Sequence, residues 1–373
     1  MRIAQIAPPM ESVPPTLYGG TERIVSYLTE ELVRLGHHVT LFASGGSITS
    51  ASLVPCLPRA LRLDANVRDV IPYYMLMLDR VRQRSDEFDI LHFHIDQFHF
   101  PIFREIAGRT VTTLHGRQDL PDLRPLYAGF PDMPLVSISK SQRYPVSNAN
   151  FVANIPHGLP DEPLRPLRDR SGGYVAFLGR VAPEKRPDRA IIIARALGIP
   201  LRIAAKVDRV DEAYFRETIE PLLKGVGVEF VGEINERDKR EFLGQADALL
   251  FPIDWPEPFG LAMIEAMACG TPVLAFRCGS VSEVVEDGVT GVIVDTVDEA
   301  IRALPQVIAL DRRKVRTQFE QRFSVTRMAM DYLAVYRSLL ESSSAASRIQ
   351  LDSLVIERTQ TNGINAPAEL ASA

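Results

Sequence analysis

The chain has 373 residues, of which 46% are hydrophobic and 24% are charged, and its formal net charge at pH 7 is -5. This length favours two domains over one, and the composition is typical of a soluble globular protein with a full core. The acidic balance argues against general nucleic-acid binding, which requires a basic surface.

The three cysteines and the apolar runs narrow the class further. The number of cysteines is odd, and no CxxC spacing occurs among Cys56, Cys269 and Cys278. Neither a disulfide framework nor a zinc site is therefore expected, and this usage fits a reducing cytoplasm. The N-terminus does not read as a signal peptide, and no apolar run is long enough to cross a membrane. Association with a membrane surface stays open.

The first half begins as a parallel α/β sheet. A buried strand is predicted over 2–7, followed by a proline-bearing loop, the pair Gly19-Gly20, an amphipathic helix over 23–35 and a strand over 39–43. Glycine amides at a helix start can approach a phosphate closely, although a plain tight turn fits the pair as well. The loop lacks the Gly-x-Gly-x-x-Gly of a Rossmann oxidoreductase.

Histidines gather at the ends of the next strands. His92 and His94 end one predicted strand and His99 follows it, but this ligand set is incomplete, so a metal site is the less favoured interpretation. His115 follows a strand over 109–114, where open α/β sheets place ligands. A structural, hydrogen-bonded histidine is an equally good interpretation from these residues alone.

A linker and a basic loop open the second half. Residues 161–173 are rich in Pro, Arg, Asp and Gly, which indicates a boundary between domains. A strand over 174–178 then leads into a loop with Arg180 and Lys185, and a helix over 189–197 follows. Arginine can hold two oxygens at once and lysine adds a point charge, so the loop suits a diphosphate. A solvated basic turn is the usual alternative for this spacing.

The most informative run is residues 254–270, which read as a loop followed by a helix. Pro258 stands where a first helical turn would begin, and the bare amides of such a turn favour an anion. Glu257 lies on the loop and Glu265 about two turns into the helix, where each carboxylate suits a hydroxyl-rich ligand. Most glutamates at this spacing are simply solvated, but Glu265 lies among apolar residues, where a charge needs a partner.

This run resembles a known family. The pair Glu257 and Glu265, the Pro-Phe-Gly between them and the Cys-Gly-Thr-Pro-Val that follows are similar to the Glu-x7-Glu region of the family 4 (group 1) retaining glycosyltransferases, and Gly-Arg-x4-Lys at 179–185 matches the family pattern. The resemblance implies the GT-B fold, in which two doubly wound Rossmann-like α/β domains face each other across a cleft. The expected parts are an acceptor-side domain (1–160), a linker (161–173), a nucleotide-sugar-binding domain (174–322), a helix returning to the first domain (323–340) and a disordered tail (341–373).

The resemblance also implies an activity and its residues. It indicates an enzyme of the hexosyltransferase type that moves a sugar from a nucleoside-diphosphate donor to a hydroxyl of a glycan, glycolipid or small molecule, with retention of configuration. The catalytic residues implied are Glu257, Arg180, Lys185 and His115, and the donor-binding residues are Gly19, Gly20, Glu265, Phe259, Gly260, Leu261 and Ala262. Relatives commonly have Asn-Gly-Val-Asp where this chain has His157 to Pro160, so any role of that Asp is absent here.

The partners follow from the same resemblance. The chain contains no Asp-x-Asp triplet, so no obligatory metal or other cofactor is expected besides the nucleotide-sugar co-substrate. The expected acceptor is a glycan or a lipid-linked glycan, the setting is polysaccharide biosynthesis in the cytoplasm, and contact with the inner face of a membrane is left open. Two alternatives remain, a nucleotide-sugar epimerase on the same fold and a non-catalytic nucleotide-sugar-binding homologue. Product analysis separates the first alternative, and detectable turnover excludes the second.

Overall fold

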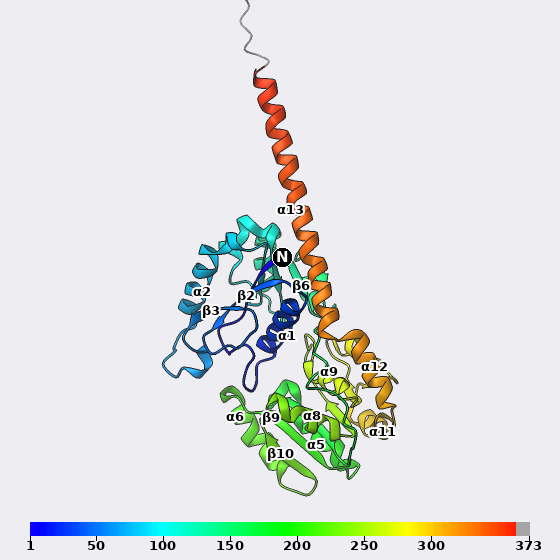
Figure 1. The fold of residues 1–373 in the computed structure, drawn as a ribbon. Coiled ribbons are helices and arrows are strands. Elements are labelled where there is room, and N and C mark those ends of the chain that lie inside the picture. Colours follow the sequence, from blue (N-terminus) through cyan, green and yellow to red (C-terminus); the bar gives the residue numbers. More distant parts are fainter. Residues whose placement is uncertain (363–373) are drawn as a thin grey trace, which may run out of the picture.

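The computed structural model describes the backbone of residues 1–362 and the side chains of residues 1–343. Two sheets, one from each half of the chain, organise the molecule (Figure 1). The first sheet contains β1 (Arg2–Ile6), β2 (His38–Ser44), β3 (Ser52–Leu57), β4 (Ile90–Phe93), β5 (Thr110–Thr113), β6 (Leu135–Ser137) and β7 (Phe151–Asn154). The second contains β8 (Val175–Arg180), β9 (Leu201–Lys206), β10 (Val228–Gly232), β11 (Ala248–Phe251), β12 (Val273–Phe276) and β13 (Gly291–Val294).

Both sheets are parallel and doubly wound. The strand order is β3-β2-β1-β4-β5-β6-β7 in the first and β10-β9-β8-β11-β12-β13 in the second. In each sheet the chain leaves its first strand toward one edge and later returns to the other side of that strand, so a switch point lies between β1 and β4 and another between β8 and β11. Ligands of open α/β sheets bind at such points, beyond the carboxyl ends of the strands.

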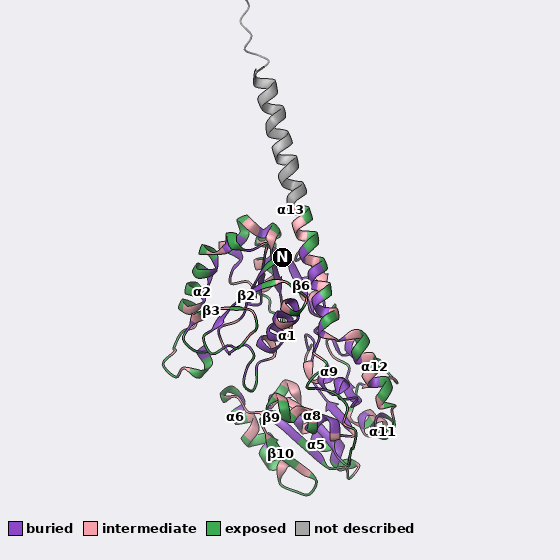
Figure 2. Cartoon of the chain, viewed as in Figure 1, coloured by how far each residue is buried: buried purple, intermediate pink, exposed green. Residues whose placement is uncertain are grey.

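Helices cover the sheets on both faces, which is why the inner strands are buried throughout. Every residue of β4, β5, β11 and β12 is buried, and Figure 2 shows the buried strands between helices with exposed outer faces. The helices are α1 (Gly20–Arg34), α2 (Ile71–Gln83), α3 (Phe100–Phe103), α4 (Leu123–Gly129), α5 (Pro187–Ala196), α6 (Glu212–Tyr214), α7 (Glu220–Leu223), α8 (Glu236–Gln245), α9 (Leu261–Ala268), α10 (Val281–Val284), α11 (Val297–Ile308), α12 (Arg312–Arg322) and α13 (Val325–Asn362). Short 3-10 turns lie at Leu61–Leu63, Ser85–Glu87, Arg104–Arg109, Ser141–Val146, Pro183–Lys185 and Arg209–Asp211, with a π-helical turn at Phe215–Ile219.

The last helix returns from the second domain to the first. The hydroxyl of Ser324 accepts a hydrogen bond from the amide of Arg327 at 3.3 Å, which caps the start of the helix. α13 then runs beside α1 (Figure 1). The buried side chains of Tyr332 and Tyr336 contact the first domain through Thr113 and His92.

The prediction of a disordered tail from residue 341 onward is wrong for residues 341–362, because the backbone of α13 stays helical as far as Asn362. Extending a helix that is already formed avoids the cost of a new nucleus, so a Ser- and Thr-rich continuation can remain helical. Residues 363–373 lie outside the described part of the chain. Within that described part, no helix combines the length and apolarity needed to span a bilayer.

The two halves touch through polar contacts that border the space between the sheets. Arg23 on α1 forms an ion pair of 2.8 Å with Glu236 on α8, and the amide of Tyr18 donates to Glu233 at 2.9 Å. On another side, the carboxylate of Glu283 accepts hydrogen bonds from the amides of Lys140 and Ser141, each at 2.7 Å. Residues 161–173, which contain no helix or strand, connect the halves. The proposed domain boundaries in that segment stay a prediction.

Candidate functional site

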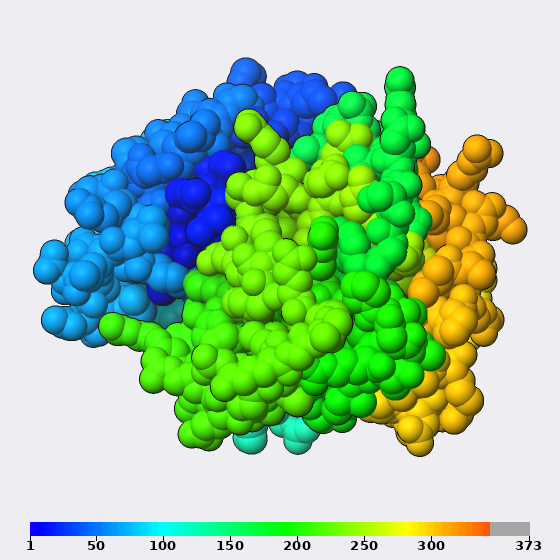
Figure 3. Space-filling model, turned by 90° about the horizontal axis from the view of Figure 1, so that it is seen from below, coloured from blue at the N-terminus to red at the C-terminus, as the bar shows by residue number. Residues whose placement is uncertain are grey.

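A cleft of about 510 Å³ lies between the two halves, beyond the carboxyl ends of β1, β4, β8 and β11. Figure 3 looks into this side of the molecule, where the N-terminal residues, in dark blue, lie between the lighter blue and the green parts. Every residue that the sequence assigned to the site lines the cleft. From the first half these are Gly19, Gly20 and His115, and from the second half they are Arg180, Lys185, Glu257, Phe259, Gly260, Leu261, Ala262 and Glu265.

Two helices, one from each half, begin at this cleft and approach each other closely. α1 starts at Gly20, and a Cβ atom added there would lie only 3.2 Å from the Cδ1 atom of Leu261, the first residue of α9. Each helix start carries amides without an intrahelical partner and the positive end of the helix dipole. The cleft therefore offers an anion the starts of two helices.

α9 begins later than the sequence suggested. The helix was expected to start near Pro258, but Gly260 has a left-handed backbone (φ 83°) that cannot continue a right-handed helix, so the first helical residue is Leu261. A Cβ atom at Gly260 would also lie 2.6 Å from the Cε atom of Met263. The left-handed backbone therefore favours glycine at this position, and the helix start that follows it, Leu261 and Ala262, lines the cleft.

Glu257 is held by a lysine and a tryptophan. Its Oε2 atom forms an ion pair with Lys185 and accepts a hydrogen bond from the indole of Trp255 at 2.9 Å. The ammonium of Lys185 also lies 4.7 Å from the centre of the Trp255 ring. Since both side chains of the ion pair are largely buried, the positions of charge and carboxylate are well defined before any ligand arrives.

Glu265, a charged residue in apolar surroundings, is paired with a lysine. Its Oε1 atom lies 2.5 Å from the ammonium of Lys239, which is 3.2 Å from Glu236. Glu236 is in turn bound by Arg23 and by the hydroxyl of Tyr27, both on α1. The second glutamate of the motif is therefore linked through three charged groups to the other half of the protein. Sequence reasoning missed Lys239, because Glu-Arg-Asp-Lys-Arg-Glu reads as a solvated helix face.

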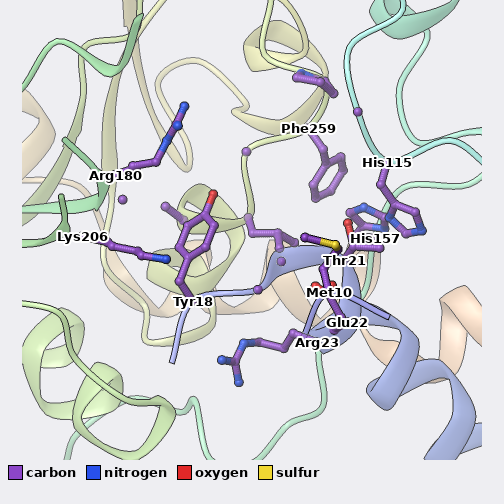
Figure 4. A pocket seen from close by; sticks show the side chains of 18 of the residues that line it. Met10, Tyr18, Thr21, Glu22, Arg23, His115, His157, Arg180, Lys206 and Phe259 are labelled. Carbon is purple, nitrogen blue, oxygen red and sulfur yellow. The ribbon is translucent and has the colours of Figure 1, made fainter. Parts of the chain in front are cut away.

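Arg180 lines the cleft but is engaged by acidic side chains. Its guanidinium contacts Glu184 at 2.5 Å and Asp211 at 3.2 Å. Nearby, the ammonium of Lys206 lies 5.3 Å from the ring of Tyr18, and Figure 4 shows these two side chains together with Arg180 beyond them. An anionic ligand would have to compete with Glu184 and Asp211 for Arg180.

A chain of hydrogen bonds fixes the proton positions on His115. Burial lowers the pKa of His115 to about 3 and that of His94 well below its ordinary value, so both rings are neutral. The amide oxygen of Gln5 is 2.7 Å from Nε2 of His94, which must therefore carry its proton there, and Nδ1 of His94 accepts from Nε2 of His115 at 2.9 Å. Nδ1 of His115 is left as an acceptor, buried and without a partner among the described side chains.

His157, where relatives commonly have Asn, joins the same cluster. Its ring stacks on His115 with centroids 5.2 Å apart and meets the Phe259 ring edge-on at 4.9 Å (Figure 4). Its Nδ1 atom is also buried without a partner among the described side chains. The departure from the family pattern thus places a second neutral imidazole on the cleft wall.

The metal interpretation of the histidine cluster finds no support in the geometry. Nδ1 of His92 lies 2.7 Å from the Tyr336 hydroxyl, and Nε2 of His99 lies 2.9 Å from the hydroxyl of Thr112. Among the side chains that the structure describes, no group of three or more His, Cys, Asp or Glu residues could hold a metal ion. The expectation that the reaction needs no metal stays a prediction.

Comparisons with known proteins define the fold and then the family. A glycosyltransferase of avilamycin A biosynthesis, AviGT4, superposes with a TM-score of 0.69 at 23% identity, over 91% of this chain and 98% of that one. Anabaena HepE, solved in complex with UDP and glucose, gives 0.69 at 18% identity, over 91% and 100%. The two parallel Rossmann-like domains are those of the GT-B fold.

The family profiles match most of the chain. Residues 165–322 match "Glycosyl transferases group 1" and residues 18–148 match "Glycosyltransferase Family 4". A phosphatidyl-myo-inositol mannosyltransferase of Mycobacterium leprae is 25% identical over 92% of this chain and 98% of its own length. A D-inositol 3-phosphate glycosyltransferase of the same species is 32% identical, but that match covers 50% of this chain and only 46% of the relative. The chain belongs to the family 4 (group 1) glycosyltransferases.

Proposed function

We propose that this protein transfers a hexose from a nucleoside-diphosphate sugar to a hydroxyl of an acceptor, with retention of the anomeric configuration. The observation that carries the proposal is the meeting of the two helix starts in one cleft with Lys185, Glu257 and Glu265 around them. The names of the relatives, which include a mannosyltransferase and a protein bound to UDP and glucose, support the same class of reaction.

The diphosphate of the donor would lie between the two helix starts. As the bond to the sugar breaks, negative charge builds on the leaving diphosphate, and fixed dipoles and cations aimed at it lower the barrier. In this proposal the amides of Leu261 and Ala262, the backbone of Gly20 and the ammonium of Lys185 would supply these groups. Arg180 would join them on exchanging its carboxylate partners for phosphate oxygens. These cationic groups make an obligatory metal unnecessary in this proposal.

The two glutamates would bind hydroxyl groups on either side of the diphosphate. Glu265 lies deeper, on α9, and is assigned to the ribose of the nucleotide, whereas Glu257 is assigned to the transferred sugar. Nδ1 of His115, the acceptor without a partner, would receive a hydrogen bond from a sugar hydroxyl. No side chain is assigned as a nucleophile, because the proposed reaction proceeds by attack of the acceptor on the same face of the sugar from which the diphosphate leaves.

The test is ligand-induced stabilisation followed by product analysis. Thermal unfolding is measured with UDP-, GDP-, ADP- and TDP-sugars for the wild type, for Glu265→Ala and for Glu241→Ala, which makes the same change at an exposed site on α8. A ligand at about 100 times its dissociation constant adds about 2.7 kcal/mol to the free energy of unfolding. One nucleotide should stabilise the wild type and the Glu241 variant but not the Glu265 variant.

Product analysis then decides between transfer and epimerisation. NMR of the product formed from that donor should show a new glycosidic bond with the donor's anomeric configuration. Stabilisation by none of the nucleotides, or equal stabilisation of the Glu265 variant, would contradict the site. A changed donor sugar without a transfer product would indicate an epimerase.

A further inference from the structure

The part of the cleft formed by the first domain contains two acidic side chains, Glu22 and Asp96, outside the ion pairs of the described residues. Glu22, in the first turn of α1, is 6% exposed and lines the cleft, as does the half-buried Asp96 after β4 (Figure 4 shows Glu22). Neither carboxylate takes part in an ion pair among the described side chains. Burial raises the pKa of both, that of Asp96 to about 6.

The arginines on the same wall are already neutralised. Arg23 is 2.8 Å from Glu236, and Arg62 is 3.0 Å from Glu11, which lies behind it with a largely buried side chain. These are the cationic side chains that the first domain contributes to the cleft lining. With both paired, the local charge of this wall is that of Glu22 and Asp96.

An aromatic pair borders the same carboxyl groups. The rings of Tyr74 and Phe98, which line the cleft, are stacked with centroids 4.6 Å apart. Besides burial, the charges of Asp96 and Glu22 raise the pKa of Tyr74. Ring edges or faces beside hydrogen-bond acceptors suit a sugar, which has apolar C–H surfaces and many hydroxyl donors.

Resting on the function proposed above, we propose that the acceptor is an uncharged polyhydroxy compound, a sugar or cyclitol without phosphate or carboxylate, and that Asp96 and Glu22 bind its hydroxyl groups. A phosphate or carboxylate at this wall would face two carboxylates and no free cation, and like charges in such proximity weaken binding strongly. The matched relatives include the D-inositol 3-phosphate glycosyltransferase named above and an N-acetyl-alpha-D-glucosaminyl L-malate synthase of Bacillus anthracis, which is 24% identical over 86% of this chain. Inositol 3-phosphate and L-malate are anions, so the acceptor of this chain would differ in charge from the compounds in those two names.

The experiment compares acceptors that differ only in a phosphate. Transfer from the donor and equilibrium binding to the nucleotide-saturated protein are measured for glucose and glucose 6-phosphate, N-acetylglucosamine and its 6-phosphate, and myo-inositol and inositol 3-phosphate. Each neutral sugar is also offered as its octyl glycoside, which distinguishes a free sugar from a lipid-linked one. The neutral member of the preferred pair should be favoured by about tenfold or more in kcat/KM.

Matched variants test whether the carboxylates cause the preference. Asp96→Asn, and separately Glu22→Gln, should narrow the neutral-to-phosphorylated ratio, whereas Asp79→Asn, the same charge change on an exposed residue of α2, should leave it unchanged. Any one of three results would overturn the inference. The phosphorylated member of a pair could be preferred, the ratio could stay the same in the Asp96 and Glu22 variants, or no neutral compound could show either binding or transfer. If the donor is bound and consumed but the phosphorylated acceptors have the higher kcat/KM, only this inference fails. If no nucleotide sugar is bound or consumed, the proposed function fails and the inference with it.

Discussion

The variant Asp96→Asn is expected to be more stable than the wild type at pH 8, by up to about 3 kcal/mol. Burial in the cleft raises the pKa of this carboxyl from 3.8 to about 6, so the native state disfavours its ionised form. Asparagine has nearly the same shape and no charge, and both residues tolerate the left-handed backbone found at Asp96 (φ 51°). The substitution therefore removes a charge whose burial destabilises the native state, and it leaves the packing unchanged.

The sign and size of the effect follow from proton linkage. Because the folded pKa is above the unfolded one, the native state is penalised once the pH is above 3.8, and the penalty reaches its full size above pH 6. It amounts to about 3 kcal/mol at pH 8 but only about 1.6 kcal/mol at pH 5, where the native carboxyl is mostly protonated and the unfolded one is ionised. The gain from Asp96→Asn should fall accordingly between the two pH values.

Urea unfolding followed by circular dichroism measures this gain at both pH values. Asp79→Asn serves as the control, because it removes a carboxylate from an exposed position of α2 and should change stability by less than about 0.5 kcal/mol. A gain for Asp96→Asn that is the same at pH 5 and pH 8 would refute the reasoning, since a backbone or packing effect has no such pH dependence. A loss of stability at pH 8 would refute it outright.

Three further substitutions test the site and the contact between the domains. Lys185→Met should leave the protein folded but reduce turnover of the donor by about 10²- to 10³-fold, measured by nucleotide release, because a cation facing the leaving diphosphate is lost; a loss below about tenfold would remove Lys185 from that role. His157→Asn, which restores the residue common in relatives, should cost about 1–2 kcal/mol in urea unfolding because the Phe259 ring loses a neighbour, and unchanged stability would contradict that packing. Glu283→Gln should lower the free energy of unfolding by about 1–2 kcal/mol, because a carboxylate that accepts two amide hydrogen bonds at 2.7 Å is replaced by a neutral amide; no change would mean that this contact does not hold the domains.

Local sequence signals predicted most of the donor side of the site. Residues 254–270 combine an apolar helix with prolines, a glycine and two glutamates, and in the structure both Glu257 and Glu265 line the cleft. The glycine pair at the start of α1 and the basic loop after β8 were recognisable because each lies between a strand and a helix. Parallel sheets place such loops at one edge, which is why residues far apart in the chain meet there.

The acceptor side and the partners of the glutamates were not predictable in this way. Lys239 lies on a helix face that reads as solvated, and its contact with Glu265 depends on how α8 packs against α9. Asp96 follows a histidine-rich strand end that draws attention to metal binding, and nothing local shows that its carboxyl is buried in the cleft without a cation. The start of α9 was misplaced because Pro258 is a good first helical residue, whereas the decisive feature is the left-handed backbone of Gly260.

The returning helix α13 affects the hydrogen bonds of the site as well as the packing of the first domain. The hydroxyl of Tyr336 lies 2.7 Å from Nδ1 of His92 and 3.3 Å from the amide nitrogen of Gln5. The contact with the amide nitrogen orients Gln5 so that its oxygen faces His94. The series of hydrogen bonds then ends at Nδ1 of His115, which is buried and has no partner among the described side chains. The proton positions on the histidine that faces the proposed sugar are therefore determined by a tyrosine more than 200 residues later in the sequence. In this protein the crossing helix supports the hydrogen-bonding pattern of the cleft as well as the first domain's core.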